Sequence, residues 1–160
     1  MAWSVRNLRD MEWWKRGPGG WVTDAVEDDS AQVGVNVFVL EPGDKMAMYH
    51  WEADQEGFLV LSGEAILVID GEERTIRQWD YVHCPPGVPH TRIGAGTGTC
   101  VILAIGARDH QTGDGWGGYP YSELAMKYDA SAEEETTDPD VAYARFPDRE
   151  PAEFEERWLA

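Results

Sequence analysis

GDKMAMYHWEADQEGFLVLSG, residues 43–63, and WDYVHCPPGVPHTRIG, residues 79–94, are the two most informative stretches of this sequence. Four of their residues, two histidines and two glutamates, make a donor set typical of a site for a divalent transition metal. The four residues are His50, Glu52, Glu56 and His90. Burial of two carboxylates without a cation is costly, so the pattern predicts either a bound metal or exposure to solvent.

The spacing of these four residues indicates that they converge. His50 and Glu52 are two positions apart, and on a β-strand this spacing places both side chains on one face. Glu56 follows after a short bend that can turn it toward the same interior. His90 comes from a distant strand, held by the stiff proline-rich turn at 85–89. Any one of these residues alone would more often lie at a polar surface, so the prediction rests on the joint pattern.

Short strand-like segments extend outward from the two stretches. Valine alternates with other residues at 33–39, the period-two signature of a strand. Further strands are expected at residues 46–51, 57–61, 65–69, 72–77, 81–84, 90–93 and 100–105. The Asp70-Gly71 pair between two of them is typical of a hairpin turn. Strands at such regular spacing predict an antiparallel barrel or sandwich.

Two arms flank the expected barrel domain, residues 32–108. The N-terminal arm, residues 1–31, contains four tryptophans, and we expect it to pack on the barrel or on a second subunit; a ligand-stacking tryptophan is the alternative. The C-terminal arm, residues 109–160, contains a glycine-rich loop at 113–118 and is expected to form short helices. Their predicted positions are 121–128, a capping box at 131–134, 138–144 with Asp138 as N-cap, and 151–158.

Composition narrows the class of protein. A chain of 160 residues with 42% hydrophobic residues and eight tryptophans fits one folded domain. The formal net charge of -17 disfavours nucleic acid and anionic membranes as partners. It also disfavours a strongly anionic substrate, unless a local positive centre such as a metal attracts it.

The same composition predicts a cytoplasmic protein. No stretch approaches the ~20 apolar residues of a membrane span, and the first residues lack the basic-then-apolar order of a signal peptide. Cys84 and Cys100 do not make a disulfide framework, which favours a reducing compartment. A single bridge between the two cysteines is the alternative.

Residues 43–94 resemble the cupin superfamily. Its first motif reads Gly, a short spacer, His-x-His, three or four residues, Glu, six residues and Gly. The corresponding positions here are Gly43, His50, Glu52, Glu56 and Gly63. The second motif reads Gly, five residues, Pro-x-Gly, two residues, His, three residues and Asn. The corresponding positions here are Trp79, Pro85-Pro86-Gly87, His90 and Gly94. This sequence therefore departs from the family at Glu52, Trp79 and Gly94, and its first spacer is one residue longer.

The resemblance implies an all-β fold, an antiparallel double-stranded β-helix (the jelly-roll or cupin barrel) with an N-terminal arm and short C-terminal helices. It also implies that His50, Glu56 and His90 bind a divalent metal, which is Fe, Mn, Ni or Zn. Glu52 stands where the family has a second histidine, and it either completes a formally neutral site or acts as a general base. Asp54 could replace Glu52 as a ligand if the register slips.

His83 is the second candidate catalytic residue beside Glu52. It either lines the cavity as an acid or base, or is a hydrogen-bonded histidine of the core. Cys84, with the opposite strand parity, is expected in the core.

The resemblance implies a metal-dependent enzyme of dioxygenase, isomerase or lyase type that acts on a small organic molecule. The alternative is a non-catalytic cupin module that binds a metal or small ligand for storage or sensing. A degenerate cupin with an empty site is disfavoured by the four ligand-capable residues at motif positions. We expect a homodimer, because the arms carry more aromatic residues than a monomer should expose.

Overall fold

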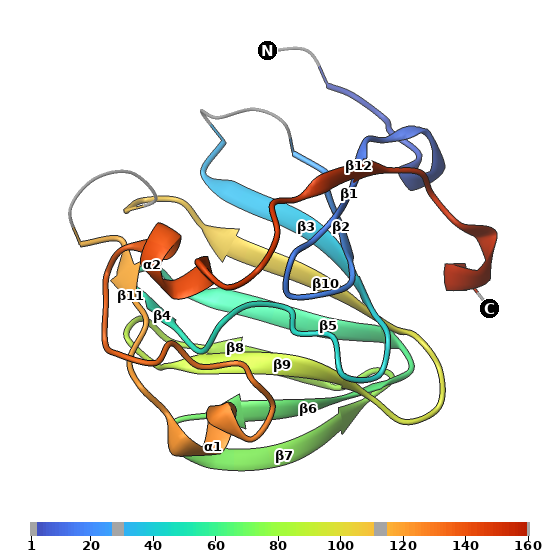
Figure 1. Ribbon diagram of the computed structural model, residues 1–160. Helices are drawn as coiled ribbons and strands as arrows, with labels where there is room; N and C mark the ends of the chain where they lie inside the picture. Colours follow the sequence, from blue (N-terminus) through green and yellow to red (C-terminus); the bar gives the residue numbers. More distant parts are fainter. Residues whose placement is uncertain (1–2, 27–30, 111–114, 160) are drawn as a thin grey trace.

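The computed structural model describes residues 3–26, 31–110 and 115–159. Its strands pair antiparallel in a large sheet, a small sheet and one short ribbon (Figure 1). The large sheet has the order β12 (Glu150–Ala152), β1 (Trp13–Lys15), β2 (Trp21–Asp24), β3 (Val33–Leu40), β10 (Cys100–Ala107), β5 (Glu56–Ser62) and β8 (Tyr81–Cys84). The small sheet has the order β7 (Glu72–Arg77), β6 (Glu64–Ile69) and β9 (His90–Ala95).

The remaining elements are short. A two-residue ribbon pairs β4 (Trp51–Glu52) with β11 (Gly117–Gly118). Two α-helices, α1 (Glu123–Met126) and α2 (Pro139–Tyr143), and two 3₁₀ helices, η1 (Leu8–Asp10) and η2 (Glu156–Leu159), lie in the arms. None of the helices in the described ranges has the length and apolarity needed to cross a membrane.

The main core lies between the large and the small sheet. Phe58 and Ile102 of the large sheet pack with Ala65, Leu67 and Ile76 of the small sheet, and all five are buried. Alternation of apolar and other residues along these strands produces that single buried face. The observed architecture confirms the predicted all-β fold of antiparallel strands.

Most predicted strands have close counterparts in the structure. The segments at 72–77 and 81–84 are β7 and β8 with the predicted limits. The turn between β6 and β7 has positive φ at both Asp70 and Gly71, as a type I′ hairpin requires. The predicted hairpin is therefore confirmed.

The prediction of a strand at 46–51 is wrong for most of its length. Only Trp51 lies in a strand, and the preceding segment touches β9 through isolated bridges at Lys45 and His50. The backbone N–H of Met48 donates to the Tyr143 hydroxyl, so it is not part of a ladder. Isolated contacts with residues distant in sequence, in β9 and at Tyr143, therefore fix the position of this segment. It does not form a continuous ladder with a neighbouring strand.

Two predicted C-terminal helices are also absent from the described residues. The Ser131 hydroxyl does not cap a helix; it accepts from the Ser122 backbone N–H and donates to the Ala132 carbonyl. Residues 151–158 instead form the end of β12 and the start of η2, with Pro151 on an edge strand where its missing N–H is tolerated. The helix capped by Asp138 is confirmed as α2, and α1 lies within the predicted 121–128 segment. Of the loop predicted at 113–118, residues 113–114 lie outside the described residues, and the prediction is wrong for Gly117–Gly118, which form β11.

Strands from both arms extend the large sheet, as Figure 1 shows for β1, β2 and β12. Trp13 of the N-terminal arm and Trp158 of the C-terminal arm are both buried, with ring centroids 4.8 Å apart. They pack on Val39 and Val101 of the sheet. The N-terminal arm therefore packs on the barrel through Trp13. The domain limits at 31/32 and 108/109 stay predictions.

Candidate metal centre

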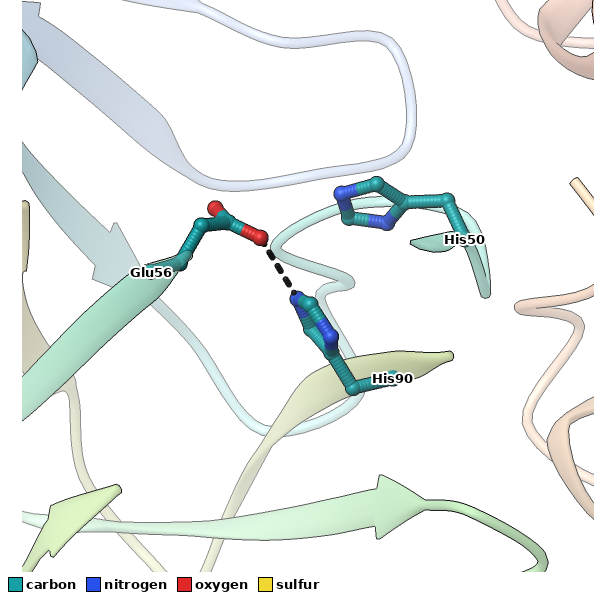
Figure 2. A group of neighbouring side chains, drawn as sticks. All are labelled: His50, Glu56 and His90. Atoms are coloured by element: carbon teal, nitrogen blue, oxygen red, sulfur yellow. Dashed lines mark ion pairs between the residues drawn. The ribbon is translucent and has the colours of Figure 1, made fainter. Parts of the chain in front are cut away.

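Three predicted ligands come together at one end of the space between the sheets. His50 precedes β4, Glu56 is the first residue of β5, and His90 is the first residue of β9. The backbones of His50 and His90 bond reciprocally, with N···O distances of 3.1 and 2.8 Å, and this fixes the two histidines as neighbours. One ligand atom from each of the three residues lies within 4.8 Å of the others. Figure 2 shows the three side chains pointing toward one another.

Hydrogen bonds set the tautomer of both histidines. His50 Nδ1 lies 2.7 Å from the Met48 carbonyl oxygen, and His90 Nδ1 lies 2.8 Å from the Val88 carbonyl oxygen. A carbonyl only accepts, so each Nδ1 carries the proton. With the proton on Nδ1, a metal-binding imidazole offers the lone pair of Nε2, and Nε2 is the atom of each ring that faces the centre.

The contact between Glu56 and His90 lacks a proton at neutral pH. Glu56 Oε2 lies 3.0 Å from His90 Nε2 (Figure 2), yet neither atom has a hydrogen-bond partner among the described residues. Burial, reinforced by the Arg92 charge, lowers the pKa of His90 to about 4. Burial opposes ionisation of the Glu56 carboxyl, but the neighbouring positive charge of Arg92 favours the carboxylate, and the pKa of Glu56 is lowered. Two lone pairs thus face each other in a buried place, which a cation between them would stabilise.

Glu52 lies beside this centre. Its Oε1 is 3.5 Å from His50 Nε2, and its side chain is 31% exposed. The three-residue cluster does not include it. Its role as a fourth ligand or as a general base stays a prediction.

Asp54 and His83 are engaged elsewhere. Both oxygens of the Asp54 carboxylate accept hydrogen bonds from His110, one from the backbone N–H and one from Nδ1, each at 2.7 Å. This pairing leaves Asp54 unsuited to replace Glu52 as a ligand. His83 is exposed on β8, and its Nε2 lies 3.5 Å from Gln55 Oε1. The His83 side chain lies on the exposed face of this edge strand. It therefore neither packs in the core nor lines the cavity beside the metal centre. Cys84 is buried in the core as predicted, and both cysteines are free.

A cavity of about 310 Å³ is lined by two of the three ligands, His50 and Glu56. Besides His50, Glu52 and Glu56, its lining includes four residues that the sequence interpretation did not assign: Arg16, Arg92, Arg108 and Tyr119. The sequence carried a signal for Arg92, since it follows His90 by two positions and so shares its strand face. It carried none for Arg16 and Tyr119, because these come from the two arms.

Comparison with known proteins supports the assigned fold, and the matching family model covers most of the predicted barrel domain. Residues 36–106 match the family model described as a cupin domain. A candidate sugar phosphate isomerase from Acidithiobacillus ferrooxidans is similar in structure, with a TM-score of 0.54 and 27% identity over 57% of this chain and 61% of that one. The present chain thus spans about three fifths of the length of that protein.

Two further structures share the fold at lower identity. A sugar phosphate isomerase of the cupin superfamily from Silicibacter pomeroyi has a TM-score of 0.60 and 22% identity, over 66% of this chain and 76% of that one. A cupin-like protein from Thermotoga maritima has a TM-score of 0.56 and 21% identity, over 76% of this chain and 90% of that one. No curated protein matches the sequence.

Proposed function

We propose that this chain, whose residues 36–106 match the family model of the cupin domain, is a metal-dependent enzyme of isomerase type that acts on a small organic molecule. His50, Glu56 and His90 would hold a divalent transition metal. One observation carries the proposal: two Nε2 lone pairs and a buried carboxylate oxygen converge beside a cavity of about 310 Å³.

The protein groups around the centre fit such chemistry. A bound dication would supply a Lewis acid that polarises a carbonyl or hydroxyl group of the substrate. Glu52 lines the same cavity, and its partly exposed carboxylate is placed to take up and return a proton. Burial raises the pKa of Tyr119, so its hydroxyl stays protonated at neutral pH and is able to donate a hydrogen bond.

The isomerase class is favoured over the other cupin reactions by one similar structure. Within the aligned part, which covers 57% of this chain, the candidate sugar phosphate isomerase from A. ferrooxidans is 27% identical in sequence. Isomerisation next to a carbonyl needs a polarised oxygen and one base that moves a proton between neighbouring carbons. The proposed ligands and Glu52 supply the protein part of both requirements.

An isomerisation assay with aldose and ketose phosphates tests the proposal. We expect turnover that a chelator abolishes and that one of Fe, Mn, Ni or Zn restores. Loss of general-base catalysis costs about 10²–10⁴-fold in rate, so Glu52→Gln should lower kcat within that range while metal content is retained. Glu133→Gln, a change at an exposed glutamate outside the cavity, is the matched control. Stoichiometric metal without turnover on any substrate would favour the non-catalytic binding module instead.

A further inference from the structure

We propose that the cavity beside the metal centre binds the negatively charged group of a small organic anion, a carboxylate or a phosphate ester, through Arg92, Arg16 and Arg108. The inference rests on the proposed function, because it assigns a substrate class to the same site. The binding groups themselves are nevertheless protein side chains that are present with or without a metal.

The cavity is far less acidic than the chain as a whole. The sequence has 30 acidic residues against 13 lysines and arginines. The cavity lining, however, contains three arginines and two carboxylates, Glu52 and Glu56, and Asp24 pairs with one of these arginines, Arg108. A dication at the metal centre would make the charge at this place positive. The overall charge of -17 therefore does not oppose an anionic substrate at this place, because a local positive centre attracts it.

Arg92 is the strongest element of the site. Its side chain is only 1% exposed, and its guanidinium carbon lies 3.1 Å from the centroid of the Phe58 ring. Among the described residues its Nε has no hydrogen-bond partner, and its Nη2 has a weak contact at 4.0 Å to Cys84 Sγ. A buried guanidinium with unused donors is costly unless an anion accepts from them. Its planar fork matches the two oxygens of a carboxylate or phosphate.

The carboxylate of Glu56 does not by itself compensate the buried positive charge of Arg92. The carboxylate of Glu56 is directed at His90, 3.0 Å away, and belongs to the proposed ligand set. Once that carboxylate compensates a metal, Arg92 remains as a buried cation beside the cavity. An anionic substrate would satisfy its charge and its donors together.

Arg16 and Arg108 are held in place at the same cavity. Arg16 follows β1, donates from Nη1 to the carbonyls of Lys45 and Met46, and stacks on the Phe38 ring at 5.3 Å. Arg108 follows β10 and pairs with Asp24 at 3.6 Å. Because these contacts fix the arginines before a ligand arrives, less conformational entropy is lost on binding. The N-terminal arm thereby contributes directly to the proposed substrate site.

Calorimetric titration tests the inference with inorganic phosphate and malonate as probes and glucose as the neutral control. Each titration uses the full-length protein at fixed ionic strength, once metal-loaded and once with chelator. We expect at least one anion, and not glucose, to bind in both states. A hydrogen bond to a charged group contributes about 1.5–3 kcal/mol, so Arg16→Gln and Arg92→Gln should each weaken that anion about tenfold or more. Arg74→Gln, at an exposed arginine paired with Glu72, should stay within about twofold of wild type because it lies outside the cavity.

The outcomes separate this inference from the proposed function. Preferential binding of phosphate would identify a phosphate ester, and preferential binding of malonate a carboxylate. Arg16→Gln still decides the question if Arg92→Gln does not fold. No anion binding, or equal binding by wild type and Arg16→Gln, would overturn the inference. So would binding that disappears with chelator while the arginine variants match wild type. A protein that binds no metal yet binds an anion through the arginines would contradict only the proposed function.

Discussion

At the scale of single residues, the two histidines of the centre are oriented by the same kind of local hydrogen bond. Each Nδ1 bonds the carbonyl of the residue two positions before it, Met48 for His50 and Val88 for His90. The sequence identified both histidines through their spacing from Glu56 and from the proline turn. It could not identify the tautomer, which depends on how the preceding backbone bends.

The lowered pKa of His90 predicts how the metal-free protein responds to acid. In the unfolded chain this histidine titrates near its ordinary value of 6.5, whereas in the fold its pKa is about 4. Between these values the unfolded state binds more protons, so folding stability falls as the pH falls. We expect the free energy of unfolding, measured with urea and chelator, to decrease by about 2 kcal/mol from pH 7 to pH 5 through this residue.

His90→Gln is the variant that isolates this contribution. His110, whose pKa is raised by its bond to Asp54, changes stability in the opposite sense, since its contribution is present at low pH and lost as the pH rises. The difference between wild type and His90→Gln removes that background. Parallel stability curves for the two proteins between pH 7 and pH 5 would contradict a neutral, buried His90.

At the scale of elements, the departures from the cupin motifs have distinct structural consequences. Gly94, where the family has Asn, lies against the backbone of Glu41, and a Cβ at this position would collide with the Glu41 carbonyl oxygen. Trp79, where the family has Gly, keeps the left-handed backbone with φ of 74° and exposes 70% of its surface. The turn between β7 and β8 therefore retains a glycine-like conformation that tryptophan adopts at a cost.

Trp79→Gly should consequently stabilise the protein. Relief of left-handed strain should raise the free energy of unfolding by roughly 1–2 kcal/mol. The greater freedom of glycine in the unfolded chain should lower it by about 0.5–1 kcal/mol. We expect a net increase of about 1 kcal/mol in the free energy of unfolding by urea. Trp79→Ala is the matched control, because it removes the ring but keeps the Cβ. Equal stability of the two variants would show that the ring, and not the backbone, sets the effect.

Most strands could be predicted because alternation and turn residues encode them locally, as for β7 and β8. The segment before β4 was predicted wrongly because its backbone partners lie far along the chain, for example Tyr143 for Met48. The same reason hid Arg16, which reaches the cavity from the N-terminal arm. Local patterns and the motif resemblance thus predicted the fold and four metal-binding candidates, three of which converge. Contacts between distant segments complete the cavity.

At the scale of the whole molecule, the arms extend the large sheet and one of them reaches the site. Trp13 and Trp158 join the arms to each other on that sheet. Trp3, by contrast, is 89% exposed, and Val5 near it is also exposed. Exposed apolar side chains of this kind favour association with another surface.

A homodimer therefore stays our expectation for the protein in solution. Light scattering after size exclusion should give about twice the chain mass of 17.9 kDa. Replacement of Trp3 and Val5 by serine should shift the mass to that of one chain if the arm forms the interface. A monomer at micromolar concentration in the wild type would contradict the expectation.

Elemental analysis of protein purified without added metal and without a metal-binding tag tests the central claim most directly. The account predicts about one equivalent of Fe, Mn, Ni or Zn, as expected for one site of three protein ligands. His50→Ala and His90→Ala should each lose this metal while the circular dichroism spectrum of the fold is retained. A full equivalent of metal in both variants, or a wild type that contains no metal and is not stabilised against heat by any of the four, would contradict the claim.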